Sequence, residues 1–205
     1  MAEYWDQTPG PVLVLGLGNP GARYAGTRHN LGYAVTGLVA ERHGLGLTRS
    51  GHKSLWGKGR VAGREVIIAQ PQTYMNLSGE AAQSLVSYYG LEPGSLIVVH
   101  DDLDLPLGRL KVAIKGGPGG HKGVASIIAL VGSEFFGRLK VGIGRPRFEE
   151  STEKFVLSGF YADQREKVVE TVQDAADCLE VMLASGAQAA MQRFHRPYSN
   201  EEEEG

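Results

Sequence analysis

Two short apolar runs constrain the fold of this chain most strongly. Residues 12–15 and 96–99 are of strand length and contain no polar position, and the first run is bounded by Pro11 and Gly16. A strand that faces solvent on one side alternates apolar and polar residues, whereas a strand covered on both faces does not. Both runs are therefore predicted to be central strands of a parallel sheet.

The residues between these runs follow helical or strand periodicity. Apolar residues at helical spacing predict helices over 30–43, 79–89 and 162–185, a shorter one over 187–194, and one that carries Val124 and Ile127. Alternation predicts a hairpin of 53–61 with 65–69 and strands at 110–114 and 138–143. Strands that alternate with helices indicate an α/β fold, a single domain with a twisted, mixed, mostly parallel central sheet flanked by helices.

Composition sets the boundaries and the class of protein. With 205 residues, 42% of them hydrophobic, we expect one domain over 11–197, a flexible N-terminal extension over 1–10 and an acidic disordered tail over 198–205. The lone Cys178 excludes an intrachain disulfide framework and favours a reducing cytoplasm. No run approaches the roughly 18 apolar residues of a membrane span. A net charge of −2 leaves only local basic patches for nucleic acid, and nothing demands more than a monomer.

Gly16, Gly18 and Gly21 spell the G-x-G-x-x-G pattern of a dinucleotide-binding turn. That turn requires a helix that starts within the motif, so that its amides meet the pyrophosphate. Here the helical pattern begins only near Leu31, and Glu41, at the right distance for a ribose contact, lies inside it. We therefore expect no cofactor, and instead a sharp turn that exposes Asn19 at the carboxyl edge of the sheet.

Four polar residues fall next to predicted buried elements: Asn19, His29, Asn76 and Asp101. A carboxylate held against one imidazole nitrogen makes the other more basic, so His29 with Asp101 could activate a water molecule. The Asn76 amide could donate to the oxygen that becomes negative when a carbonyl is attacked. Each residue also has an ordinary structural interpretation, as a turn, a helix cap or a loop anchor, and only their joint placement favours ester hydrolysis.

Three further groups carry alternatives. His100, Asp101, Asp102 and Asp104 suggest a metal site, although no second histidine and carboxylate cluster is evident, and no metal is expected. His121 follows a glycine-rich stretch that can approach a ligand closely, or it simply starts a helix. Basic residues on two alternating strands form either a phosphate-binding strip or a solvated face: Arg109, Lys111, Lys115, Arg138 and Lys140.

Taken together, the motifs resemble one family. The chain resembles the bacterial-type peptidyl-tRNA hydrolases from about residue 12 to residue 196. The motifs that carry the resemblance follow one another in the same order as in that family, at residues 16–21, Tyr24, 27–30, 74–79, 100–104, 119–121 and 141–144. The resemblance implies an esterase that needs no metal and cleaves the bond between a peptide and the terminal ribose of tRNA. It also implies that tRNA, through its acceptor stem and 3′ end, is the partner.

The resemblance assigns roles to individual residues. It implies that His29 is the catalytic base, that Asp101 orients it, and that Asn19 and Asn76 hold the substrate and the attacking water. Tyr24 and Met75 would line the region of the peptide and terminal ribose. His121 is predicted to be a further substrate- or tRNA-binding residue.

The implied tRNA contacts match the family less closely. Lys140 matches a phosphate-binding residue, whereas Ala113 stands where the family often has lysine, so Lys111 or Lys115 would substitute. Lys122 replaces the usual asparagine after His121 and lacks the acceptor of an amide, so a substrate contact must change there.

Two other functions remain open at this point. A relative with the same fold could bind structured RNA without hydrolysing it, although the presence of His29, Asp101, Asn19 and Asn76 argues against a loss of activity. A nicotinamide-dependent oxidoreductase would follow from the glycine pattern alone and would require saturable binding of the cofactor.

Overall fold

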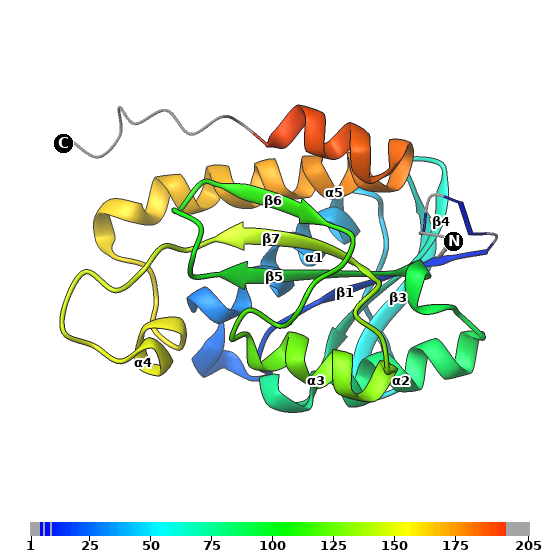
Figure 1. Ribbon diagram of the computed structural model, residues 1–205, viewed down its shortest axis with the longest axis horizontal. Coiled ribbons are helices and arrows are strands. Elements are labelled where there is room, and N and C mark those ends of the chain that lie inside the picture. The colour runs from blue at the N-terminus through cyan, green and yellow to red at the C-terminus, as the bar shows by residue number, and fades with distance from the viewer. Residues whose placement is uncertain (1–4, 6, 9, 196–205) are drawn as a thin grey trace.

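The computed structural model describes residues 5, 7, 8 and 10–195, which build a mixed sheet of seven strands (Figure 1). The strand order is β2-β3-β4-β1-β5-β7-β6. Strands β4, β1, β5 and β7 run parallel in the middle, and β2, β3 and β6 pair antiparallel at the two sides. Their bounds are β1 Val12–Gly16, β2 Arg49–Gly51, β3 Ser54–Val61, β4 Arg64–Pro71, β5 Leu96–Asp102, β6 Leu110–Ala113 and β7 Gly137–Gly142. The predicted α/β class and sheet type are confirmed.

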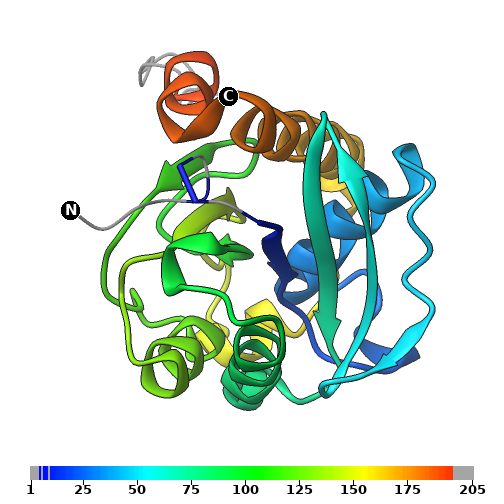
Figure 2. The same ribbon diagram turned by 90° about the vertical axis from the view of Figure 1, so that its right-hand side faces the viewer.

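Helices cover both faces of this sheet (Figure 2). They are α1 Leu31–Arg42, α2 Ser78–Tyr89, α3 Lys122–Val131, α4 Thr152–Val156 and α5 Arg165–Phe194. Val12 and Val14 of β1 pack in the core that α1 and α5 share, whereas Leu13 and Leu15 pack in the core formed with α2 and α3. The apolar run at residues 12–15 is therefore continuous because β1 is buried on both faces, as the sequence indicated.

The glycine-rich turn after β1 serves close packing. A Cβ atom on Gly16 would lie 2.5 Å from the Gly32 carbonyl oxygen, and one on Gly32 would lie 2.3 Å from that of Val99. Only glycine allows α1 to approach β1 and β5 so closely. Because α1 begins at Leu31, it does not start inside the glycine motif as a dinucleotide-binding turn requires.

The N-terminal segment differs from the expected pattern, whereas the interruption of the last helix agrees with it. The Trp5 ring, inside the segment expected to be a flexible extension, is fully buried against Gly137, and its Nε1 donates to the Met182 carbonyl at 2.9 Å. At the other end, Gly186 (φ 82°, ψ 177°) interrupts α5 between the two predicted helical stretches. The expected tail over 198–205 lies outside the described residues. Among the residues described, no helix is both long and apolar enough to cross a membrane.

Candidate active site

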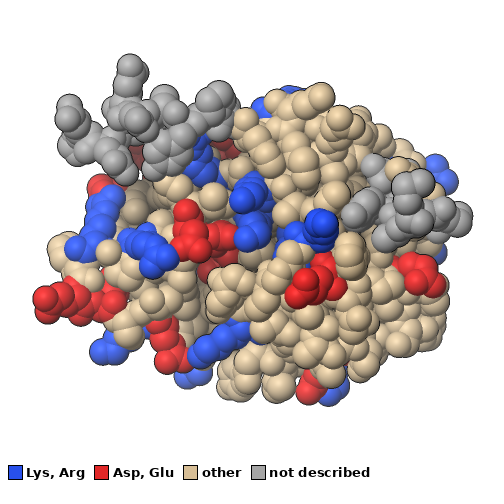
Figure 3. Space-filling model, in the orientation of Figure 1, with Lys and Arg blue, Asp and Glu red and all other residues tan. Residues whose placement is uncertain are grey.

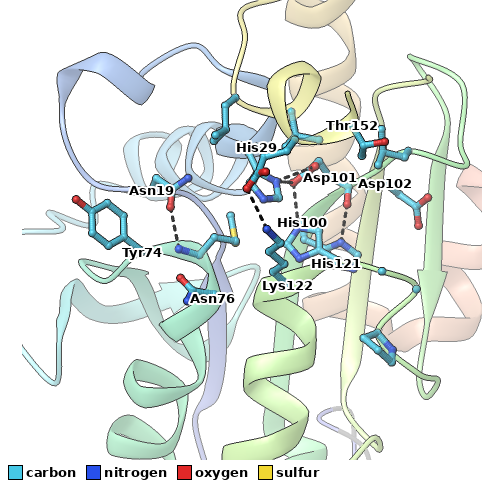
Figure 4. Close-up of a pocket in the computed structure, with 18 of the residues that line it drawn as sticks. Asn19, His29, Tyr74, Asn76, His100, Asp101, Asp102, His121, Lys122 and Thr152 are labelled. Carbon is cyan, nitrogen blue, oxygen red and sulfur yellow. Dashed lines mark hydrogen bonds and ion pairs between the residues drawn. The ribbon is translucent and has the colours of Figure 1, made fainter. Parts of the chain in front are cut away.

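The loops at one edge of the sheet enclose a cleft of about 740 Å³. The four parallel strands all present their carboxyl ends at this edge, where open α/β proteins place their sites. The cleft is lined by the segment after β1, the turn between β4 and α2, the end of β5, the glycine-rich loop before α3, and α4. Residues far apart in sequence therefore meet here (Figure 4).

His29 and Asp101 form a buried pair at the centre of the cleft. His29 lies in a 3₁₀ turn, Arg28–Asn30, just before α1, and Asp101 lies near the end of β5. The His29 Nδ1 atom is 2.9 Å from Asp101 Oδ1 and 3.0 Å from Oδ2. An ionised carboxylate can only accept hydrogen bonds, so Nδ1 carries a proton, and in the neutral ring the lone pair is on Nε2. The structure thus brings together the two residues that the sequence paired.

His121 holds the same carboxylate from the other side. It caps α3, because its Nδ1 accepts from the amides of Gly123 at 3.2 Å and Val124 at 3.3 Å. Nδ1 is therefore unprotonated, and Nε2 donates to Asp101 Oδ1 at 3.1 Å. His121 therefore starts α3 and also lines the cleft. Its tautomer is fixed by the helix.

The charge of Asp101 depends on these two rings. Burial alone would raise the pKa of Asp101, but electrostatic attraction and hydrogen bonds from His121 and His29 hold that pKa well below its ordinary value. Asp101 is therefore ionised at neutral pH. His100 packs against His121, with ring centroids 4.8 Å apart, and burial, with a smaller contribution from His121, lowers the pKa of His100 to about 3. His100 is therefore a neutral residue of the wall.

Asn19 presents its amide NH₂ to the cleft in a fixed orientation. Its Oδ1 accepts from the Met75 amide at 2.8 Å, and a backbone amide can only donate, so the oxygen and nitrogen positions are determined (Figure 4). The Asn30 side chain holds the backbone of Asn19 through bonds of 2.9 and 3.0 Å to its amide and carbonyl. The sequence analysis missed this role of Asn30. The only feature of the sequence that points to Asn30 is its position next to His29.

Other predicted residues line the cleft more loosely. Tyr24, Met75 and Asn76 all contribute to its lining. The Met75 side chain is buried, whereas Asn76 is exposed and makes no hydrogen bond within the part of the chain that is described. The amide that the sequence suggested as the oxyanion donor is thus less constrained than that of Asn19.

Lys122 meets the cleft from the start of α3 and pairs with a residue that the sequence analysis did not select. Its Nζ lies 3.1 Å from Glu153 Oε1 on α4, and both side chains are more than half exposed. Helix α4 also contributes Thr152 and Val156 to the lining. With five residues, α4 is too short for its periodicity to be detected in the sequence.

The basic strip is smaller than the sequence predicted. Lys111 and Lys140 are direct partners in the register of β6 and β7, and Lys115 is exposed beyond the end of β6. The interpretation of Arg138 as a member of this strip was wrong, because Arg138 is fully buried and donates to the carbonyls of Gly116 and Gly117. Figure 3 shows cationic and anionic side chains intermixed on the face that carries β6 and β7.

Lys140 already has an anionic partner on the protein. Its Nζ is 2.8 Å from Asp102 Oδ2. Burial would raise the pKa of Asp102, but the hydrogen bond from Lys140 and a second one from the Asp104 amide lower it overall. A phosphate at Lys140 would therefore compete with a carboxylate.

Two groups bear on the metal alternative. In the predicted cluster, Asp102 is paired with Lys140 and Asp104 with Arg145, so these two acids point to cations of the protein. His29, Asp101 and His121 offer ligand atoms within 4.8 Å of one another. His29 Nδ1 and His121 Nε2 are each hydrogen-bonded to Asp101, so a metal that used these two nitrogens would have to displace both bonds.

Comparisons with known proteins give one consistent result. The family model described as peptidyl-tRNA hydrolase matches residues 13–203. A peptidyl-tRNA hydrolase of Carboxydothermus hydrogenoformans is 46% identical over 184 residues, which are 90% of this chain and 98% of that protein. One from Mycobacterium tuberculosis is 44% identical over 188 residues, or 90% and 97% of the two chains.

Solved structures show the same similarity. The crystal structure of peptidyl-tRNA hydrolase from Acinetobacter baumannii matches with a TM-score of 0.85 and 29% identity, and the match covers 95% of this chain and 97% of that one. A complex of peptidyl-tRNA hydrolase with N-propanol matches with a TM-score of 0.84 and 30% identity, over 90% and 94% of the two chains.

Proposed function

The chain belongs to the bacterial-type peptidyl-tRNA hydrolase family and hydrolyses peptidyl-tRNA, and we propose that it does so with His29 as the general base. The observation that carries the proposal is the bond from His29 Nδ1 to Asp101, which places the lone pair of the neutral ring on Nε2, in a ring that lines the cleft. In the proposed reaction Nε2 takes a proton from water as the water oxygen bonds to the ester carbon. The resulting imidazolium is stabilised by the ionised Asp101.

The Asn19 amide is the proposed donor to the developing oxyanion. Its Nδ2 is held in place by the Met75 amide and by Asn30, and a donor that needs no reorganisation is worth roughly 10²–10³ in rate. When the tetrahedral intermediate collapses, the bond to the ribose oxygen breaks and His29 Nε2 returns its proton to that oxygen. The products are the free tRNA and the peptide carboxylic acid, which releases its proton to solvent. Asn76, Tyr24 and Met75 contact the substrate in this proposal.

We further propose that Lys111, Lys115 and Lys140 bind phosphates of the acceptor stem. Lys111 and Lys140 lie opposite each other on one sheet face, which supports a shared role. Each residue proposed for catalysis comes from the same chain, which supports action as a monomer, with the cytoplasm as the expected location. Neither a cofactor nor a metal enters the proposed steps.

The test compares the wild-type protein with His29→Ala on N-acetyl-aminoacyl-tRNA. We expect turnover to fall by about 10²–10⁴, the contribution of a positioned general base, while the affinity for deacylated tRNA stays within about twofold. Wild-type turnover should survive a chelator. Equal turnover in His29→Ala would reject the base, and loss of wild-type turnover with the chelator would favour a metal at His29, Asp101 and His121.

A further inference from the structure

Arg28, the residue before the proposed base, is fully buried and faces away from the cleft. Its neighbour His29 lies on Asp101, whereas the Arg28 guanidinium lies against the segment that follows α4. The Arg28 backbone amide also donates to the Ser158 carbonyl at 3.1 Å, and Thr27 forms a β-bridge with Gly159. The turn that carries the base is therefore joined to the end of α4.

The guanidinium makes its strongest contacts with that segment. Nη1 lies 2.6 Å from both the Ser158 hydroxyl oxygen and the Gly159 carbonyl, and 3.3 Å from the Phe155 carbonyl. Its Cζ atom lies 3.9 Å from the centroid of the Phe155 ring and 4.6 Å from that of Tyr161. Carbonyl groups at a helix end lack partners within the helix, and here Arg28 supplies one.

The carboxylate of Glu150 attracts this buried cation only from a distance. Among the residues that the structure describes, none with a negative charge forms an ion pair with Arg28, so carbonyl dipoles and aromatic faces replace water around it. Burial lowers the pKa of Arg28 from its usual value. Lysine could not reproduce these contacts, because it has one nitrogen where arginine has a planar fork.

Helix α4 cannot hold its own position. A helix of five residues is far shorter than the roughly 12–15 residues at which isolated helices become even marginally stable. Yet α4 supplies Thr152, Glu153 and Val156 to the cleft wall. Its placement comes from tertiary contacts: Phe155 and Val156 are buried in the hydrophobic core, and the Arg28 guanidinium binds the segment at its end.

We propose that Arg28 is a positioning residue that fixes α4 as the substrate-binding wall of the cleft, beside the turn that carries His29. This inference rests on the proposed function of the cleft. Arg28 touches neither the reacting atoms nor Asp101, so it acts through α4. Loss of the anchor should weaken substrate binding and leave the chemical step intact, because His29, Asp101 and Asn19 are held by other contacts.

The test uses Arg28→Lys and Ser158→Ala in the full chain. For Arg28→Lys we expect KM for N-acetyl-aminoacyl-tRNA to rise about tenfold, with kcat within about threefold of wild type and an unchanged pH profile of kcat. Amide hydrogens at 155–158 should exchange at least about tenfold faster, and those of α3 should not. Ser158→Ala keeps the buried charge and removes one acceptor of Arg28, together with the bond from the Ser158 hydroxyl to the Phe155 carbonyl. It should show a smaller change of the same kind, and it replaces Arg28→Lys in the test if Arg28→Lys does not fold.

Arg64→Lys is the matched control. The Arg64 guanidinium also binds backbone carbonyls, those of Trp5 and Thr8, but at the start of β4, the opposite edge of the sheet. It should lose stability with KM and kcat unchanged. The inference is overturned if folded Arg28→Lys, or Ser158→Ala in its place, keeps the KM and the amide exchange rates of the wild type. It is also overturned if kcat falls in that variant without a rise in KM, or if Arg64→Lys raises KM by the same factor. Exchange needs no substrate, so a failure of His29 as the base would leave this test valid.

Discussion

Replacing Asp101 by asparagine should abolish the base by reversing the tautomer of His29. The His121 Nε2 atom must donate to position 101, because the α3 amides occupy its Nδ1. The asparagine oxygen would therefore take the place of Oδ1, and its NH₂ group the place of Oδ2, 3.0 Å from His29 Nδ1. That NH₂ can only donate, and the asparagine oxygen, 2.9 Å from Nδ1, is shared with His121, so the substitution favours the His29 proton on Nε2.

The size of the effect follows from what Nε2 does. A protonated Nε2 cannot accept a proton from water, so the whole contribution of the general base is lost, roughly 10²–10⁴ in kcat. At about 1.36 kcal/mol per factor of ten, this corresponds to about 2.7–5.4 kcal/mol of transition-state stabilisation. KM should change little, because Asp101 is 2% exposed and the substitution keeps its shape.

Single-turnover hydrolysis of N-acetyl-aminoacyl-tRNA measures this loss. Asp177→Asn is a matched control, since Asp177 pairs with Arg42 on the surface and should leave kcat unchanged. If folded Asp101→Asn keeps more than about a tenth of wild-type kcat, the role of the carboxylate as the determinant of the tautomer is refuted.

Two further predictions concern pH and salt. The pKa of His100 is about 3 in the folded state and about 6.5 in the unfolded state, so between these pH values the unfolded chain binds one more proton. The contribution of His100 to the free energy of unfolding is therefore complete above pH 6.5, and the free energy falls by about 1.4 kcal/mol per pH unit below it. In urea titrations from pH 6.5 to 4.5, His100→Asn should lose that slope, and the same slope in both proteins would contradict a neutral buried His100. Lys140→Ala should weaken tRNA binding and reduce the slope of log K against log salt by about 0.7–0.9, one phosphate contact, whereas Lys167→Ala on α5 should not. An unchanged slope would assign Lys140 to the pair with Asp102.

The sequence predicted the parts of the fold that depend on local periodicity. The run at 12–15 is uniformly apolar because β1 lies between two helical layers, and the pairing of His29 with Asp101 follows because parallel strands end at the same edge. These inferences require only the pattern and the topology that it implies.

The parts that the sequence did not predict depend on tertiary contacts. Arg138 alternates with apolar residues like a solvated cation, yet the Gly116 and Gly117 carbonyls bind it inside the protein. Helix α4 is too short to leave a periodic signal, and Arg28 stabilises it from more than a hundred residues away in the chain. Trp5 is buried because Gly137 leaves room for its ring, which no nearby residue indicates.

The position of the proton on the His29 ring tests the proposed mechanism most directly. Nitrogen-15 NMR of histidine-labelled protein at pH 7.5, assigned by comparison with His29→Ala, distinguishes the two tautomers of the neutral imidazole. The structure predicts a proton on Nδ1, bonded to Asp101, and an unprotonated Nε2. A proton on Nε2 in the wild-type enzyme would contradict His29 as the base that activates water.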